Sequence, residues 1–171
     1  MAKVIARASG LPGAAQGASS TAEFQFVDNQ STPVRAQVKV KHASLEKRIF
    51  RVRAFGTVTG GTTTNFTVKL DYGVSATIGS NTTIADSGAI AVNSESGNWK
   101  IEAELYLDSV SGKLQGRFNG WINGTEKADT VNTEIASLTE LTEELGFTVT
   151  GTFSASNAGS GAKCEGFEIV V

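Results

Sequence analysis

Long stretches of the chain alternate between apolar and polar residues with a period of two. In the run 99–107 the odd positions are apolar, and the even positions carry Lys, Glu, Glu and Tyr. Similar alternation occurs at 34–41, 51–54, 66–74, 114–122, 147–153 and 167–171. Because successive side chains of a strand point to opposite faces, each run predicts a β-strand with one buried and one solvated face. This pattern is typical of antiparallel sheets.

Turn signals separate these runs. Ser109–Gly112, Gly60-Gly61 and Asn123-Gly124 predict hairpins, and 157–161 predicts the last turn. The sequence therefore predicts an all-β fold, an antiparallel β-sandwich or jelly roll that forms a single domain over residues 23–171. The segment 138–145 departs from the pattern. Its leucines stand three and four apart between a capping-box pattern and a glycine, which predicts at most one short helix.

Residues 1–22 predict an extended N-terminal arm. Gly10, Gly13 and Gly17 punctuate a run of Ala and Ser around Pro12. This composition cannot bury enough apolar area to offset the entropy of ordering the segment. We therefore expect the arm to be flexible or to become ordered on a partner.

Composition and charge narrow the classes of partner. Hydrophobic residues make up 40% of the 171, enough for one core. The net charge is −2, so no global charge favours binding to nucleic acid or to a membrane. No apolar run is long enough for a membrane span, and no secretory h-region begins the chain. The charge is uneven, because bases dominate between Arg35 and Arg53, where Glu46 is the single acid. The strip could face an acidic partner or be solvated.

The chain shows no catalytic or metal-binding motif. His42 is the only histidine, and Cys164, the only cysteine, is predicted to be a small buried hydrophobe. Glu102 and Glu104 share one face of a predicted strand about 7 Å apart, a spacing that a glycoside hydrolase could use. A solvated acidic face explains the pair better. We expect no enzyme activity and no cofactor.

Trp121 is the residue most indicative of a contact. It falls on the polar face of its predicted strand, beside Asn119 and Arg117. An aromatic residue on a wet face is an interface anchor or a sugar-stacking platform, unless a loop of its own chain covers it.

Three stretches carry a resemblance to a known family: VRAFGTVTGGTTTNFTVKLDYG at 52–73, GSNTTIADSGAIAVNSESGNWKIEAELYLDSVSGKLQGRFNGWING at 79–124, and GFTVTGTFSASNAGSGAKCEGFEI at 146–169. With their SGK turn, NGW segment and closing SNAG, they resemble jelly-roll structural proteins of tailed-bacteriophage virions. The resemblance covers about two thirds of the chain. It carries no catalytic residue with it.

The resemblance implies a capsid decoration (cement) protein, made in the host bacterial cytoplasm and bound to the virion's capsid surface. Its partners would be the major capsid protein and further copies of itself, a trimer being favoured. The residues expected to contact the capsid or other partners are Lys3, Arg7, Pro12, Arg35, Lys39, Lys41, Arg51, Arg53 and Trp121. The alternative is a receptor- or carbohydrate-binding virion module that uses Trp121, Asn119 and Tyr106.

Overall fold

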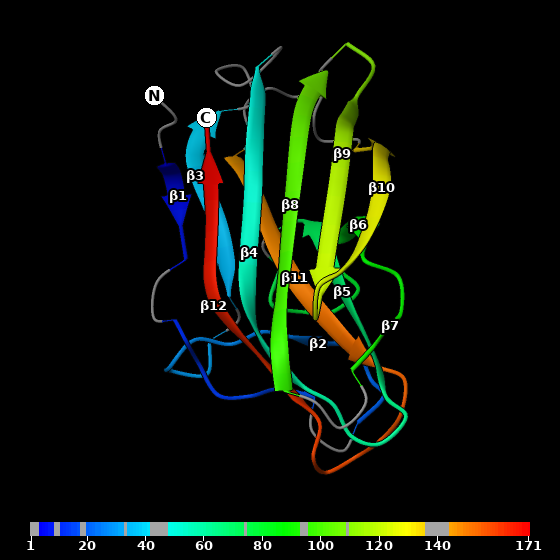
Figure 1. Ribbon diagram of the computed structural model, residues 1–171. Coiled ribbons are helices and arrows are strands. Elements are labelled where there is room, and N and C mark those ends of the chain that lie inside the picture. Colours follow the sequence, from blue (N-terminus) through cyan, green and yellow to red (C-terminus); the bar gives the residue numbers. More distant parts are fainter. Residues whose placement is uncertain are drawn as a thin grey trace.

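The computed structural model is a sandwich of two antiparallel β-sheets (Figure 1). It describes residues 4–8, 11–17, 20–32, 34–41, 48–73, 75–92, 96–108, 110–135 and 144–171. The first sheet consists, in spatial order, of β1 (Val4–Arg7), β12 (Gly161–Val170), β4 (Ile49–Thr59), β8 (Ser96–Asp108), β9 (Lys113–Ile122) and β10 (Thr125–Glu134). The second contains β2 (Phe24–Gln25), β3 (Arg35–Lys41), β11 (Glu144–Phe153), β5 (Asn65–Tyr72), β6 (Thr82–Asp86) and β7 (Ile90–Ala91). The predicted all-β jelly-roll sandwich is therefore confirmed.

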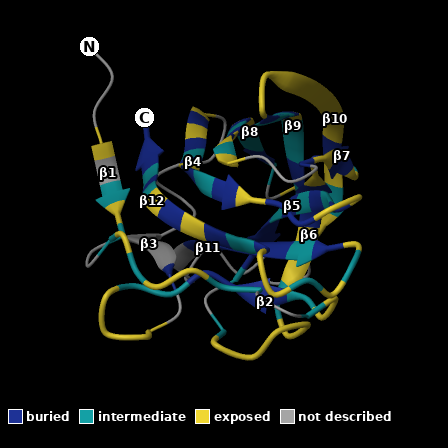
Figure 2. Cartoon of the chain, turned by 60° about the horizontal axis from the view of Figure 1, so that its bottom comes forward, coloured by how far each residue is buried: buried dark blue, intermediate teal, exposed yellow. Residues whose placement is uncertain are grey.

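The alternating pattern correctly predicts which residues face the core. Burial alternates along β4 and β8, so that Trp99, Ile101 and Leu105 are buried while Lys100 and Glu104 are exposed (Figure 2). The buried faces of the two sheets meet in one hydrophobic core. Inward side chains recur at every second residue of a strand, so the strand period decides which residues enter this core.

Aromatic contacts join the two sheets inside this core. Phe26, which follows β2, stacks on Trp99 of β8 with ring centroids 4.9 Å apart. Phe50 of β4 lies 6.2 Å from Phe147 of β11. The Trp99 indole also donates a hydrogen bond from Nε1 to the Lys163 carbonyl at 3.0 Å. Trp99 therefore has both an apolar environment and a partner for its polar atom, as a buried tryptophan requires.

Two predicted hairpins are confirmed and one is wrong. β8 pairs with β9, and 110–112 lie in the turn between them, while Ser109 is outside the described residues; Asn123-Gly124 joins β9 to β10 with both residues at positive φ, 49° and 79°. Gly60-Gly61 does not form a hairpin, because β4 and β5 lie in different sheets. The pair carries the chain from one sheet to the other. Glycine is needed at Gly60 because a Cβ there would collide with the Val92 carbonyl.

The N-terminal segment, predicted as an arm, lies against the domain at two places. β1 pairs with β12 at the edge of the first sheet, and Gln16 exchanges backbone hydrogen bonds of 2.8 and 3.0 Å with Ala162. Of the segment 138–145, predicted as a short helix, Glu144 and Leu145 instead begin β11. Its other residues lie outside the described ranges.

Candidate functional site

The outer face of the first sheet is the candidate functional site, because it brings together residues that are distant in the sequence. The strand register defines two adjacent rows across this face. One row contains Gly166, Phe55, Lys100, Trp121 and Glu126. The neighbouring row contains Arg7, Glu168, Arg53, Glu102, Asn119 and Ala128. We call them the aromatic row and the charged row.

Ion pairs connect the charged row across the strands. Arg7 Nη2 lies 2.9 Å from Glu168 Oε2, and Arg53 Nη2 lies 3.1 Å from Glu102 Oε1. Lys100 reaches the other oxygen of Glu102 at 3.1 Å, which links the charged row to the aromatic row. Opposite charges on neighbouring strands are stabilising pairs, so this face has a largely fixed pattern of charge.

The environment of Glu102 is unfavourable for glycoside hydrolysis. Partial burial alone would raise the pKa of Glu102, but hydrogen bonds from Lys100 and Arg53 outweigh it and hold the pKa below its ordinary value. A general acid needs a raised pKa, so that it carries a proton near neutral pH. Glu104, the second carboxylate of the hypothetical pair, is engaged by Arg51 at 3.0 Å. Both glutamates therefore serve as ion-pair partners on the face.

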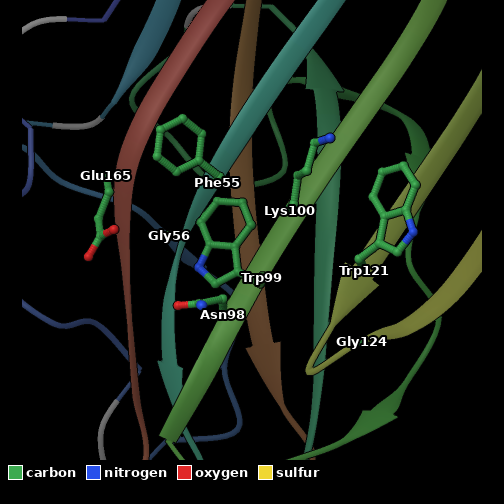
Figure 3. A pocket seen from close by; sticks show the side chains of 8 residues that line it. All are labelled: Phe55, Gly56, Asn98, Trp99, Lys100, Trp121, Gly124 and Glu165. Carbon is green, nitrogen blue, oxygen red and sulfur yellow. The ribbon is translucent and has the colours of Figure 1, made fainter.

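A hollow of about 370 Å³ lies in the aromatic row (Figure 3). Phe55 of β4 and Trp121 of β9 flank it, and Lys100 of β8 lies between them with Nζ 4.9 Å from the centroid of the Trp121 ring system. Asn98 and Glu165 add polar groups to its lining. Trp121, whose exposure the sequence left open, is half-buried. The hollow thus combines two aromatic rings, a cation, an amide and a carboxylate.

Phe55 is held in place although 48% of it is exposed. Gly166 is its partner across the strands, and a Cβ at Gly166 would occupy the space of the Phe55 ring. The missing side chain therefore lets the ring lie against the backbone of β12. This packing restricts an apolar ring on the wet side of the sheet, which lowers the entropy lost when a ligand binds.

A second apolar area lies at the far end of the same face. Ile49, 62% exposed, lines a hollow of about 300 Å³ with Val170 and Val171. Arg51 and Glu104, which are paired with each other, complete this lining. The outer face thus presents two apolar areas separated by ion pairs.

The structure divides the predicted partner-contact residues between the two sheets. Arg7, Arg51, Arg53 and Trp121 lie on the outer face of the first sheet, as the rows and pairs above describe. The backbones of Arg35, Lys39 and Lys41 lie on β3, which pairs with β11 of the second sheet. The described backbones of the bases between Arg35 and Arg53 are therefore divided between the two sheets. Pro12 is exposed after a cis peptide bond, and Lys3 and His42 lie outside the described residues.

Phe55 and Lys100 were missed as site residues. Phe55 follows Arg51 and Arg53 in the same alternating phase, so its outward direction could have been read from the sequence. Its neighbourhood could not, because Trp121 is far away along the chain.

Other features of the described part of the chain contribute little chemistry. Its His, Cys, Asp and Glu residues form no group of three that could hold a metal ion. None of its segments is a helix long and apolar enough to cross a bilayer. Cys164 is buried as predicted, and burial raises the pKa of its thiol to about 12.

No family model matches the chain, and no curated protein matches it in sequence. Solved structures of similar fold include the acidic lectin of winged bean with methyl-α-D-galactose, at 11% identity and a TM-score of 0.40, over 99% of this chain and 91% of the lectin. The CBM2 module of the evolved Dit of Lactobacillus casei BL23 phage J-1 has 10% identity and a TM-score of 0.41, over 80% of this chain and 67% of that one. A structure of infectious bursal disease virus, Gx strain, has 11% identity and a TM-score of 0.32, over 99% and 32%. These similarities concern the sandwich fold alone.

Proposed function

We propose that this chain is a non-enzymatic virion structural protein that binds the assembled capsid through the outer face of its first sheet. The observation that carries the proposal is the exposed Phe55 ring beside the half-buried Trp121, set among ion pairs. Apolar anchors surrounded by a polar rim are the common anatomy of protein interfaces. The resemblance of the sequence to phage jelly-roll proteins supplies the class of partner, the major capsid protein.

Binding only the assembled shell would stabilise it by mass action, and repetition over a symmetric lattice would add avidity. This role needs a broad, preformed surface rather than a deep pocket. The outer face spans six strands, from β1 to β10, and so provides one. Arg7 extends the charged row to the N-terminal strand, so the predicted arm would take part in the contact.

The test is co-sedimentation with expanded, undecorated capsids of the same phage. We expect saturable binding that falls at least tenfold when Phe55 and Trp121 are both replaced by alanine. The control variants Ile78→Ala and Val110→Ala remove exposed apolar residues outside the two rows, and should bind like the unmodified chain. Absence of binding by the unmodified chain would overturn the proposal, and equal binding by the double variant would overturn the assignment of the face.

A carbohydrate-binding virion module is the second candidate, favoured by the chemistry of the aromatic hollow. Sugar rings stack their C–H faces on aromatic side chains, while amides and carboxylates bind their hydroxyls. Asn98 lines the hollow from β8, between the strands of Phe55 and Trp121, and Glu165 lines it from β12, on the other side of Phe55. Binding on a glycan array that is lost in Trp121→Ala, together with no capsid binding, would establish this function in place of decoration.

A further inference from the structure

The edge strand β10 has an exposed side that no other strand covers in the described part of the chain. β10 pairs with β9 on one side and is the last strand of the first sheet (Figure 1). Its residues from Thr125 to Thr130 are all exposed, and Val131 is the first that is buried. Most edge strands are short or covered, because an open row of backbone groups is a template for another strand.

The register shows which backbone groups face outward. Ile135 N donates to the Gly112 carbonyl at 2.8 Å, and Asn123 N donates to the Asn98 carbonyl at 2.9 Å. Hydrogen-bonded pairs alternate along an antiparallel ladder, so the odd-numbered residues of β10 bond to β9. The outward groups are therefore the N–H and C=O of Glu126, Ala128, Thr130, Asn132 and Glu134.

We propose that β10 pairs with β10 of a second copy of this chain, antiparallel about a two-fold axis at Ala128. Outward groups must meet outward groups, so in each symmetric register even residues lie opposite even residues, whether the axis falls at an even or at an odd residue. Centring on Ala128 places Ala128 opposite its copy and Glu126 opposite Thr130 of the second copy. The same register places Lys127 opposite Asp129 of the second copy, twice.

Charge selects this register over its neighbours. Centring on Glu126, Lys127 or Asp129 would put two like charges directly opposite each other, which is destabilising across strands. Centring on Thr130 would put Lys127 opposite Thr133 and Asp129 opposite the buried Val131, so both charges would lose an opposite partner. Only the Ala128 centre forms two Lys–Asp pairs, and it joins the two first sheets into one continuous sheet.

Asp129 has an alternative role in the single chain. Its Oδ1 accepts a hydrogen bond from the Thr130 N–H at 2.7 Å, which covers one of the outward donors. In the pair, Thr130 N–H would donate to the Glu126 carbonyl of the second copy, and Asp129 would turn to Lys127. Exchange of one partner for another keeps both groups satisfied, so the rearrangement leaves no buried polar atom without a partner.

The contact is small, about six interchain hydrogen bonds and two charge pairs, so we expect a weak, reversible dimer. Sedimentation velocity from about 10 µM to 1 mM chain should show a species with twice the 17.8 kDa chain mass. Ala128→Pro should abolish the dimer, because proline removes an outward N–H that has no partner in the single chain. Ala128→Val keeps the N–H and should leave dimerisation within a few fold of the unmodified chain.

Charge reversal tests the register. Lys127→Asp should weaken association at least tenfold by opposing two carboxylates, and the double variant Lys127→Asp, Asp129→Lys should restore it. The circular dichroism of each variant should match the unmodified chain, which separates loss of pairing from unfolding. A monomer at 1 mM, a trimer, a dimer retained by Ala128→Pro, or a double variant no better than Lys127→Asp would each overturn the proposal. The dimer and capsid binding are measured separately, so either can fail alone.

Discussion

Asp71 shows at the scale of a single residue how burial shifts the pKa of a carboxyl group. It lies on β5 and is 4% exposed, with Oδ1 accepting from Thr83 Oγ1 at 2.6 Å. Thr150 Oγ1 lies 3.0 Å from Asp71 Oδ2 and 2.6 Å from Glu23 Oε1. A hydroxyl has one proton and cannot donate to both carboxylates. Desolvation by burial is the largest influence on Asp71 and raises its pKa above the ordinary value, although hydrogen bonds from Thr83 and Thr150 act to lower it.

Asp71→Asn should therefore change how stability depends on pH. Since the pKa of Asp71 is raised in the folded state, its contribution is fully present below the unfolded value of 3.8 and is lost as pH rises through the folded pKa. The neutral amide should remove this loss and stabilise the fold above that range by on the order of 1 kcal/mol. Urea unfolding of the variant and the unmodified chain from pH 3 to pH 8 measures the difference in their free energies of unfolding.

The control for this prediction is Asp86→Asn on β6, where the carboxylate is exposed. It makes the same chemical change at an exposed site, so the difference between the two variants isolates the effect of burial. A parallel profile for Asp71→Asn and the unmodified chain would show that Asp71 is ionised throughout the range.

At the scale of the elements, the order of the strands in the first sheet decides which side chains meet on its outer face. β8 lies between β4 and β9 in the first sheet, and this order, with the strand register, places Phe55 and Trp121 on either side of Lys100. The same order pairs Arg51 with Glu104 and Arg53 with Glu102. We infer that these charges define the face and contribute little to the stability of the fold.

A double-mutant cycle on Arg51 and Glu104 should give a coupling of about 0.2–1 kcal/mol, because their side chains are 46% and 47% exposed. The cycle on Arg53 and Glu102 should give a larger value, since those side chains are 35% and 26% exposed. Denaturant unfolding at low and high salt measures both, and salt should reduce the first coupling more. A coupling free energy of several kcal/mol between Arg51 and Glu104 would instead mean that these ion pairs contribute substantially to the stability of the fold.

At the scale of the whole molecule, the core between the sheets holds the fold together. Phe147 on β11 packs against Phe50 of the first sheet, with centroids 6.2 Å apart, and against Tyr72 at 5.8 Å. Fully buried aromatic residues at such a junction contribute transfer free energy and fill space that no neighbour can fill.

Phe147→Ala should lower the free energy of unfolding by about 3–5 kcal/mol. Phe55→Ala makes the same chemical change at a residue that is 48% exposed, and should cost about 1 kcal/mol or less. Guanidinium unfolding of the two variants measures the difference. Equal losses would mean that Phe55 belongs to the core, which would contradict its proposed role in binding through the outer face.

The sequence pattern predicted some of the strands and turns correctly and others wrongly. The alternation at 99–107 and 114–122 predicted two neighbouring strands and their buried faces correctly. Gly60-Gly61 was assigned to a hairpin because a turn signal does not say which strands it joins. The run of bases from Arg35 to Arg53 suggests one strip, but β3 and β4 lie in different sheets.

The sequence by itself determined the period of the strands, the side of each strand that is buried, and the tight turn at Asn123-Gly124. These are local properties, because alternation and positive φ act within a few residues. Only the tertiary structure decided which strands are neighbours, and so it alone brought Phe55 beside Trp121 and left β10 at an edge. Strand partners are chosen by how the entire core packs, and that choice is a property of the whole chain.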